Sequence, residues 1–459
     1  MTFEVTVDGN DRLTVDDSRE NRLGGGGQGE VYRVEYKGRQ LALKWYTARA
    51  ILENDGFREN LRGNTRRESP DKCFVWPQHF VEDGKGGYGY LMDVIDTGRY
   101  TLFSNIYNGR KRVRNAQTGR KETVEVRMSS FGTELNAAIN LANAFRSLHR
   151  QGLAYQDLND GGFYIDTETG DLLVCDCDNI APSGARDCSI VLGTYGYMAP
   201  ELVDEPGRFM PNMDTDKHSL AVLLFMLFIG GKPFDGKLLS GEMVDVSTQS
   251  RFYGRNAVFV YHPSDKSNRP IAGHHVNVIE QWPEFPPAIQ KLFTSCFVDG
   301  VTMPTRRPTE NKWIQALNSM RAGLITCACG TVEDVLTDSN IKGGKYVCPR
   351  CKSKYGVLSM SNGDRYPLKR GKAVYAASIG ATSVDAVMGY VVGKESNGRI
   401  MLGLRNDGNM DWTVSNDGRT HTINQGNGFP LDPGMIIEFG YKEKVGQDDF
   451  VRKGKGMVE

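Results

Sequence analysis

The sequence predicts an α+β chain with two lobes, followed by a cysteine-rich ribbon and a small all-β domain. Three observations predict this order. Strand patterns fill most of the first hundred residues, helical patterns dominate from there to about residue 322, and turn-bounded strands return beyond residue 366. With 459 residues, the chain is also too long for a single hydrophobic core.

The expected domain boundaries follow these changes of pattern. We predict an N-terminal lobe at 1–98, a C-terminal lobe at 99–322, a zinc ribbon at 323–356 and a β-sandwich at 366–459. Lys and Arg together equal Asp and Glu in number, so neither nucleic acid nor an anionic membrane is expected as a partner. No apolar leader is visible, and the most apolar stretch, 220–229, is too short to span a bilayer. We therefore expect a soluble, cytoplasmic protein.

A glycine-rich loop precedes two strands near the N-terminus. The segment LGGGGQGEVYRV places Gly24, Gly26 and Gly29 at the spacing G-x-G-x-x-G. Glycines let backbone N–H groups approach phosphate oxygens closely, because no Cβ intervenes. In a dinucleotide fold such a loop opens a helix, whereas here it leads into VYRVEY and then into LALK, which ends at Lys44. The order of loop, strand, hairpin and lysine-bearing strand predicts a binding site for nucleotide phosphates.

Five further motifs follow in a fixed order between residues 155 and 309. They are YQDLN at 155–159, DCD at 176–178, GTYGYMAPE at 193–201, a DxxSL motif that begins at Asp216, and an Arg-Pro-Thr that begins at Arg307. An amphipathic helix pattern precedes the first of these motifs, and an apolar strand precedes the second.

These six motifs together resemble the bacterial eukaryotic-like Ser/Thr protein kinases. The chain is most similar to a subgroup with YQDLN in the catalytic loop, DxDN in place of DFG, and a C-terminal zinc ribbon. That subgroup is associated with von Willebrand A-domain proteins and PP2C-type phosphatases in tellurite-resistance-like stress systems. The resemblance implies a bilobal protein-kinase fold, transfer of the ATP γ-phosphate to Ser or Thr of proteins, and partners of those two classes.

The resemblance also assigns roles to individual residues. Lys44 is expected to bind the α- and β-phosphates of ATP, Asp157 to accept or orient the proton of the substrate hydroxyl, and Asp176 to bind Mg²⁺ or Mn²⁺. A carboxylate from the helix after Lys44 should hold its ammonium group. Glu59 is the preferred candidate for this carboxylate, with Glu53 and Glu68 as alternatives.

Two larger sets complete the expected site. The nucleotide-binding set comprises Gly24, Gly25, Gly26, Gly27, Gly29, Val31, Ala42, Lys44, Met92, Asp93 and Val94. The structural set comprises Glu201, Asp216 and Arg307, in which Arg307 stands where a late arginine of kinases pairs with the glutamate of APE.

Several positions depart from the family pattern. Gln156 replaces the arginine of HRD, which brings activation by loop phosphorylation into question, and Asn159 replaces a lysine that neutralises the γ-phosphate. Gly162 stands where the second metal-binding Asn belongs, so Asn159, Asp160 or Asp178 are the candidates for that role, and Asp178 is included in the expected Mg²⁺ site. The alternative to an active kinase is a pseudokinase scaffold that binds nucleotide and partner proteins.

Four cysteines form two closely spaced pairs in the predicted ribbon. Cys327-x-Cys329 and Cys348-x-x-Cys351 provide four thiolates at a spacing that suits tetrahedral Zn²⁺. Because four thiolates close the coordination sphere, we expect a structural metal. An odd count of nine cysteines and the lack of a secretion signal argue against a disulfide framework.

The last predicted domain contains LDPGMIIEFG at 431–440, which is similar to the closing strands of forkhead-associated (FHA) domains. The phosphothreonine-reading pattern is not clearly present, so phosphopeptide binding and a plain docking role stay open as alternatives. A third hypothesis makes the ribbon and this domain the functional part of the chain. The basic segment 109–127 is interpreted as a solvated hairpin or a docking patch, and Ser183, Ser189 and Thr194 as candidate modification sites.

Overall fold

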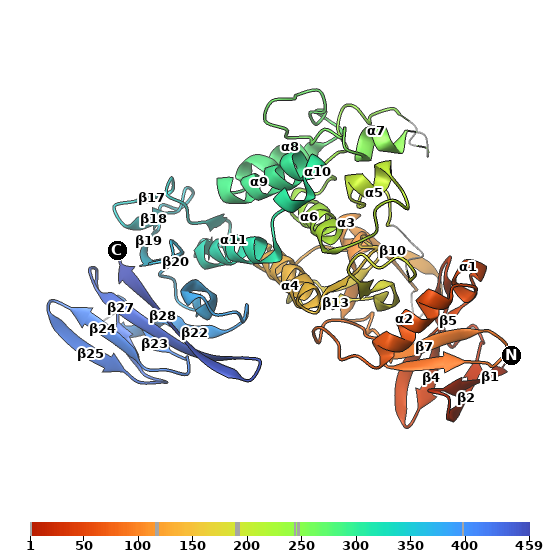
Figure 1. The fold of residues 1–459 in the computed structure, drawn as a ribbon. Helices are drawn as coiled ribbons and strands as arrows, with labels where there is room; N and C mark the ends of the chain where they lie inside the picture. The colour runs from red at the N-terminus through yellow and green to blue at the C-terminus, as the bar shows by residue number, and fades with distance from the viewer. Residues whose placement is uncertain (1, 115–118, 189–192, 243–244, 246–247, 397–398) are drawn as a thin grey trace. The chain divides into compact units, whose positions relative to one another are not determined.

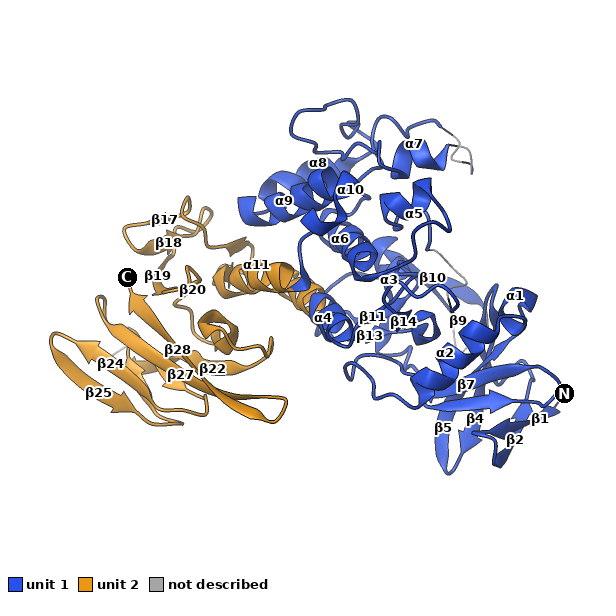
Figure 2. Ribbon diagram, viewed as in Figure 1, with its two compact units in different colours: residues 1–129, 140–310 blue, residues 130–139, 311–459 orange. Residues whose placement is uncertain are grey.

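The computed structural model describes residues 2–114, 119–188, 193–242, 245, 248–396 and 399–459. Its chain divides into two compact units, one made of residues 1–129 and 140–310 and the other of residues 130–139 and 311–459 (Figure 2). Among the described helices, none combines the length and the apolar character that crossing a membrane requires. Each unit has its own fold and is described by itself.

The first unit begins with a seven-stranded antiparallel sheet in the order β2-β1-β6-β7-β5-β4-β3 (Figure 1). Its strands are β1 (Thr2–Val7), β2 (Asp11–Asp16), β3 (Arg22–Gly25), β4 (Gly29–Tyr36), β5 (Arg39–Tyr46), β6 (His79–Glu82) and β7 (Tyr88–Asp93). The predicted turn between β4 and β5 is present, with Lys37 and Gly38 at φ of 50° and 75°, the conformation that tight hairpins favour. One apolar cluster on this sheet includes Val7, Val15 and Leu43.

A second apolar cluster includes Tyr46 and Tyr90 from the sheet, together with residues of two helices. These helices are α1 (Arg49–Leu52) and α2 (Asp55–Thr65). Asn54 caps α2 by accepting the Phe57 N–H at 2.8 Å, and Phe57 and Leu61 turn one face of α2 into the cluster. This packing determines which side chains of α2 face the segment around Ile180, on the side of the helix away from solvent.

The rest of the first unit is mainly helical, with three small sheets. Its helices include α3 (Phe103–Tyr107), α4 (Phe131–Arg150), α5 (Pro200–Asp204), α6 (Met213–Ile229), α7 (Gln249–Tyr253), α8 (Val276–Gln281), α9 (Pro287–Thr294) and α10 (Gly300–Thr302), with short turns η1 (Cys177–Asn179), η2 (Trp282–Glu284), η3 (Ser295–Asp299) and η4 (Pro304–Arg306). The small sheets pair β8 (Tyr100–Leu102), β12 (Phe163–Asp166) and β13 (Leu172–Val174), β9 (Arg110–Arg114) with β10 (Lys121–Glu125), and β11 (Leu153–Ala154) with β14 (Ala181–Pro182).

The apolar helix α6 lies in the interior, as its sequence predicts. It is buried on nearly all sides from Leu220 to Ile229. A capping box formed by Asn212 and Thr215 fixes its start, and Gly230 ends it in the left-handed conformation at φ of 66°. A rigid start matters because Asp216, one turn into the helix, contacts the candidate site.

Helix α11 (Glu310–Gly323) begins with the last residue of the first unit, and its remaining residues belong to the second unit with the C-terminal strands. The strands are β15 (Leu324–Thr326), β16 (Glu333–Val335), β17 (Ile341–Lys342), β18 (Lys345–Val347), β19 (Lys354–Met360), β20 (Arg365–Pro367), β21 (Ala373–Tyr375), β22 (Val387–Ser396), β23 (Arg399–Asn406), β24 (Trp412–Asn416), β25 (Arg419–Ile423), β26 (Gly428–Pro430), β27 (Ile436–Val445) and β28 (Asp448–Val458), with the turn η5 (Ala376–Ile379). Strands β15 and β16 pair separately, a four-stranded sheet has the order β21-β22-β23-β26, and a larger sheet runs β17-β18-β19-β28-β27-β24-β25, with β20 beside β19.

The predicted C-terminal all-β region is therefore present. Its core draws residues from both larger sheets, among them Leu404 of β23 and Ile437 of β27. Trp412 is fully buried there, with its ring centroid 4.9 Å from that of Phe439 in an edge-to-face contact.

Candidate active site

Lys44 lies near the end of β5 with its ammonium group buried among carboxylates. Its Nζ is 2.8 Å from Oδ2 of Asp178, 3.1 Å from Oδ1 of Asp176 and 3.0 Å from Oε1 of Gln28. Burial alone would lower the pKa of Lys44, but the charges of Asp178 and Asp176 outweigh that effect and raise it. The lysine is therefore held as a cation at the point where β5 meets the DCD segment.

Asp178 is the most enclosed carboxylate of this group, with no exposed side-chain surface. Besides Lys44, its oxygens accept hydrogen bonds from the hydroxyls of Tyr46 at 2.6 Å and Tyr90 at 3.1 Å. Burial, and then the charge of Asp178, raise the pKa values of both tyrosines well above the ordinary value, so both stay protonated as donors. The expectation that Asp178 binds Mg²⁺ does not fit this geometry, because its oxygens already face three donors and no solvent.

Asp176 has a different environment from Asp178. Its side chain is 51% exposed, so one face of the carboxylate is open while the other contacts Lys44. The backbone at Asp176 is left-handed at φ of 49°, a conformation that aspartate tolerates better than most residues. This bend brings two carboxylates, separated by one residue, to the same ammonium group.

Glu59, the expected partner of Lys44, is elsewhere. It lies on α2 with its carboxylate 3.3 Å from Arg62, and its side chain is 67% exposed. Glu53 instead pairs with Arg49 at 2.6 Å, and in the described part of the chain the ion pairs of Lys44 go to Asp176 and Asp178, not to Glu68. The prediction of a helix carboxylate for Lys44 is therefore wrong in this structure, because the inner face of α2 carries no acidic side chain.

That inner face of α2 carries amides. The Nδ2 groups of Asn60 and Asn64 both donate to the carbonyl oxygen of Ile180, each at 2.8 Å. Ile180 follows Asp178 by two residues, so α2 is attached to the same segment that holds Lys44, but through neutral hydrogen bonds. Nothing in the sequence of α2 taken alone indicates this arrangement, since asparagines are common on solvated helix faces.

The glycine loop runs from β3 into β4, beside Lys44. A Cβ added at Gly24, Gly26 or Gly27 would meet open space, whereas a Cβ at Gly29 would lie 2.1 Å from the Trp45 carbonyl of β5. Gly29 is thus required by strand packing, and the other three positions leave the loop backbone open to a close approach by a ligand. Gln28, which the sequence did not single out, brings its amide oxygen to Lys44.

The other expected nucleotide contacts lie on neighbouring strands. Val31 is opposite Lys44 in the β4–β5 register, and Ala42 is opposite Met92 in the β5–β7 register. Asp93 ends β7 and pairs with Arg39 at 3.0 Å between exposed side chains. These positions lie on the neighbouring strands β4, β5 and β7, and Val94 follows directly after β7.

The catalytic-loop candidates form a second cluster. Oδ1 of Asp157 accepts a hydrogen bond from the hydroxyl of Thr194 at 2.8 Å. The amide of Asn159 donates to the Asp157 carbonyl at 3.1 Å and to the Thr194 hydroxyl at 3.2 Å, while its oxygen accepts the Gly161 N–H at 2.8 Å. Asn159 therefore ties the loop together, and Asp157 faces a hydroxyl donor of the kind a substrate would present.

Gly162 lacks room for a metal-binding side chain. A Cβ at this position would lie 3.0 Å from the hydroxyl oxygen of Tyr155. That hydroxyl donates to the Cys175 carbonyl, and Cys175 N–H donates back to the Gly162 carbonyl at 2.8 Å. The same contacts join the catalytic loop to the DCD segment, so the two clusters of acidic residues belong to one site.

Asp216 holds the start of the catalytic loop through a backbone hydrogen bond. Its Oδ2 accepts the N–H of Tyr155 at 2.7 Å and contacts Nε2 of His149 at 3.0 Å. The other ring nitrogen of His149 lies 2.9 Å from Glu310. Burial alone would lower the pKa of His149, but these two carboxylates raise it to about 9. The buried imidazolium therefore links α4, α6 and the start of α11.

This network predicts a pH dependence of stability. Because the pKa of His149 is near 6.5 when unfolded and about 9 when folded, its contribution is complete below pH 6.5 and lost as pH rises to about 9. We expect the free energy of unfolding to fall by roughly 1–3 kcal/mol over this interval, more than in a His149→Gln variant. Denaturant titrations of both proteins at pH 6.5 and 9 measure the difference, and equal slopes with pH would contradict the prediction.

Arg307 and Glu201, which the sequence predicts to pair, form a buried two-pronged ion pair. Nη1 of Arg307 lies 2.8 Å from Oε1 and Nη2 lies 2.6 Å from Oε2. Arg307 also donates to the carbonyls of Gly300 and Asp214, both at 2.9 Å. The pair fixes the end of the GTYGYMAPE segment against α6 and α10.

The four cysteines of the predicted ribbon converge in the second unit. The sulfur atoms of Cys327, Cys329, Cys348 and Cys351 all lie within 4.8 Å of one another. The Thr331 hydroxyl and N–H lower the pKa of Cys329 to about 6, and Ser353 lowers that of Cys351 in the same way. Four thiols at this separation, two of them favoured as thiolates, are compatible with a tetrahedral metal.

The structure describes two of the three candidate modification sites. The Ser183 hydroxyl accepts the Met213 N–H at 3.1 Å at the start of α6, and Thr194 contacts Asp157. Ser189 lies outside the described residues. Both described hydroxyls therefore have structural contacts.

A comparison with known protein families shows which family this chain resembles. Residues 91–318 match the family described as the protein kinase domain. Over these residues, which are just under half of its length, the chain is similar to protein kinase domains. The matched segment includes Asp157, Asp176, Glu201 and Arg307, and it begins after the strand that carries Lys44.

Curated relatives of this chain include proteins of a bacterium, a plant and an amoeba. The chain is 23% identical over 311 residues to Protein kinase YegI of Escherichia coli K12, covering 66% of this chain and 45% of that protein. It is 27% identical over 255 residues to Protein STRUBBELIG-RECEPTOR FAMILY 2 of Arabidopsis thaliana, and 23% identical over 260 residues to RGS domain-containing serine/threonine-protein kinase A of Dictyostelium discoideum. These alignments cover 52% and 54% of this chain, and 31% and 21% of the two relatives. The aligned region thus spans less than half the length of each of these three relatives.

Proposed function

We propose that this protein is an ATP-dependent protein Ser/Thr kinase of the bacterial eukaryotic-like type. The observation that carries the proposal is the buried Lys44, held as a cation by Asp178 and Asp176 beside an open glycine loop. A fixed ammonium group beside a loop whose backbone a ligand can approach suits the phosphates of a nucleotide. The match to the kinase domain and the relation to YegI support the same reaction class.

In this proposal each side chain of the site has a defined task. Lys44 binds phosphate oxygens, and the hydroxyls of Tyr46 and Tyr90 keep Asp178 from leaving it. Asp157 accepts a hydrogen bond from the hydroxyl of the substrate and takes up its proton during transfer. In the structure, the Thr194 hydroxyl donates such a hydrogen bond to Asp157. Asn159 holds the loop that presents Asp157.

The residues present fit one divalent cation. The open face of Asp176 would hold Mg²⁺ or Mn²⁺, which neutralises charge on the phosphates when bound. Asp178 is enclosed, and the carboxamide of Asn159 is engaged within its loop, so neither adds a ready second ligand. Phosphate oxygens and water would complete the coordination of this ion.

A nucleotide-binding scaffold is the second candidate, and specific observations favour it. Asn159 brings no positive charge to the γ-phosphate, and Gly162 has no space for a second metal-binding side chain. A protein with these features could bind ATP without transferring its phosphate. Retention of Asp157 and Asp176 supports the enzyme over this scaffold.

Transfer of labelled phosphate tests the enzyme directly. Full-length protein is incubated with labelled ATP and Mg²⁺ or Mn²⁺, with itself and a generic protein as acceptors, and the labelled amino acids are identified. We expect label on Ser and Thr. Protein that binds ATP in a parallel titration but transfers no phosphate would contradict the enzyme and favour the scaffold.

For the cysteine cluster we propose a structural Zn²⁺ bound by Cys327, Cys329, Cys348 and Cys351. The segment around them is short, so metal binding would supply much of its folding free energy. We expect about one zinc per chain by elemental analysis, and its loss in Cys348→Ser. Cys296→Ser, at a buried cysteine outside this cluster, serves as the control, and full zinc content in Cys348→Ser would contradict the site.

The remaining proposals rest on the family resemblance. We place this protein in the cytoplasm, in a stress-signalling module with a von Willebrand A-domain protein and a PP2C-type phosphatase. The two-sheet C-terminal region supports an FHA-like sandwich that docks partners or binds phosphopeptides. Equal affinity of the full-length protein for phosphothreonine peptides and their unmodified forms would remove the phosphopeptide proposal.

A further inference from the structure

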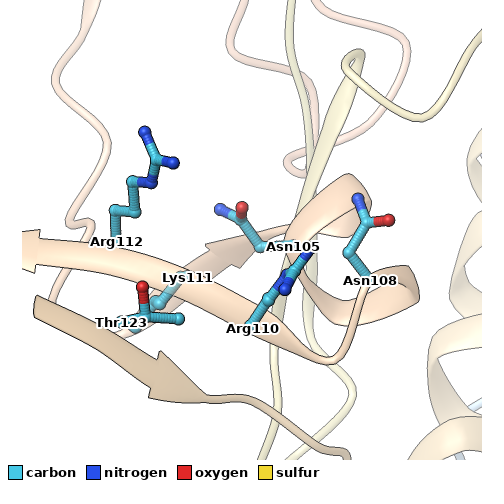
Figure 3. Close-up of a pocket in the computed structure, with 6 residues that line it drawn as sticks. All are labelled: Asn105, Asn108, Arg110, Lys111, Arg112 and Thr123. Atoms are coloured by element: carbon cyan, nitrogen blue, oxygen red, sulfur yellow. The ribbon is translucent and has the colours of Figure 1, made fainter.

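A polar depression of about 510 Å³ lies between helix α3 and the ribbon of β9 and β10 (Figure 3). Its lining consists of amides, a hydroxyl and three cationic side chains, and no carboxylate of the described residues belongs to it. The lining residues are Asn105, Asn108, Arg110, Lys111, Arg112 and Thr123. The depression is thus a concave, positively charged surface within the first unit.

The ribbon register places the two arginines on one face. Arg112 is opposite Thr123, and Arg110 is opposite Glu125, so alternate residues of β9 share that side. Figure 3 shows the side chains of Arg112 and Asn105 directed to the same side of the ribbon. Lys111 belongs to the other face, and its Nζ lies 3.3 Å from the Thr101 hydroxyl.

The charges of this lining are not neutralised from within the described protein. In the described residues, no carboxylate forms an ion pair with Arg110, Lys111 or Arg112. Glu125, the closest acid in the register, pairs with Arg127 instead. A guanidinium group is planar and suits the two oxygens of a phosphate or carboxylate, so two of them beside amide donors form a receptor for an anion.

The position of the depression points to the substrate. Helix α3 contacts the catalytic loop through the Ser104 N–H, which donates to the Asp160 carbonyl at 3.1 Å. Asp160 is three residues from Asp157, and Asn105 follows Ser104 directly. A protein chain that presents a hydroxyl to Asp157 therefore has this depression within reach of its neighbouring residues.

We propose that the depression binds a phosphate- or carboxylate-bearing side chain of the protein substrate, close to the acceptor Ser or Thr. The proposal rests on the kinase activity proposed above and names the class of substrate. A peptide fits better than nucleic acid, because Glu122 and Glu125 of β10 interrupt the positive surface that a continuous polyanion would follow. The kinase would thus favour acidic or already phosphorylated segments.

Peptide arrays test this preference with full-length protein and labelled ATP. Each position around a central Ser or Thr is varied through Asp, Glu, phosphoserine, Ala and Lys. We expect an anionic residue to be favoured at one or more fixed positions. Comparing the rates for phosphoserine and Glu peptides shows whether the depression prefers a phosphate or a carboxylate. Arg110→Ala with Arg112→Ala should raise KM for the favoured peptides about tenfold or more, with the effect shrinking at high salt.

Lys121→Ala is the matched control, since Lys121 carries the same charge on the same ribbon but does not line the depression. It should leave the peptide preference unchanged. A parent kinase without preference for anionic residues, or an equal loss in Lys121→Ala, would overturn the proposal.

Fluorescence anisotropy with the same labelled peptides tests binding without transfer. A protein that binds acidic peptides through Arg110 and Arg112 but transfers no phosphate would refute the enzyme and retain the docking surface. Direct binding of RNA or anionic vesicles that is lost in the double variant, together with no binding of the peptides, would assign the surface to another partner and overturn the proposal.

Discussion

Asp178→Ala is expected to lower the rate of phosphate transfer by about a hundredfold or more, and to destabilise the fold as well. The substitution leaves Lys44 buried with only the half-exposed Asp176 as counter-charge, and it leaves the Tyr46 hydroxyl without its acceptor. Removing one partner of a buried ion pair costs about 3–5 kcal/mol. The ammonium group would then lose the position from which it reaches phosphate.

Two measurements separate these effects. Urea unfolding gives the loss of stability, and ATP affinity with kcat, measured where the variant is still folded, gives the loss of function. Asp178→Asn keeps the volume and one of the two acceptor oxygens, so it tests the loss of the charge together with the loss of one acceptor. Glu59→Ala is the control from α2, because its exposed carboxylate should change stability by no more than about 0.5 kcal/mol. Lost activity in Glu59→Ala with full activity in Asp178→Asn would contradict the assignment.

Asp157→Asn is expected to lower kcat by about a thousandfold while ATP affinity changes little. The carboxylate accepts the Thr194 hydroxyl at 2.8 Å, and an amide at this position is a far weaker base. Losing a positioned general base lowers rates by roughly 10²–10⁴. The structure of the loop should persist, because Asn159 bonds to the Asp157 carbonyl and not to its side chain.

Single-turnover transfer at saturating ATP, with a nucleotide-binding titration alongside, measures this effect. Asp265→Asn, an exposed aspartate that caps a turn at Ser267, controls for the change of charge. Unchanged kcat in Asp157→Asn would show that the observed transfer comes from a contaminating kinase or from another base. A loss of ATP binding of the same size as the loss of rate would also contradict the assigned role.

The sequence predicts the parts of this fold whose patterns are local. The Lys37–Gly38 turn, the buried α6 and the C-terminal strands each depend on short-range rules, and each is present. The ordered motifs also predict the similarity to protein kinase domains that the family match reports over residues 91–318. In each of these cases, residues close in the chain, or a motif with fixed neighbours, determine the outcome.

The acidic partner of Lys44 could not be predicted from local sequence patterns. Three glutamates near α2 are equivalent by spacing, and the choice depends on which face of the helix turns inward. Burial of Phe57 and Leu61 turns Asn60 and Asn64 toward Ile180 and leaves Glu59 in solvent. The actual carboxylate is Asp178, far along the chain, at a position where the resemblance suggested a metal ligand. Long-range pairing of this kind requires the folded chain.

The attachment of α2 through amides bears on how inhibitors of the proposed activity would discriminate this protein from kinases whose nucleotide lysine pairs with a helix glutamate. In protein kinases a helix glutamate pairs with the nucleotide lysine, so a compound that displaces the helix breaks an ion pair. Here the anion that holds Lys44 lies on the chain beside Asp176, and displacement of α2 costs two hydrogen bonds to Ile180 but no ionic contact to Lys44. A compound of that type would find no ion pair between α2 and Lys44 to break, whereas one that separates Lys44 from Asp178 would disturb the contact that positions the ammonium group.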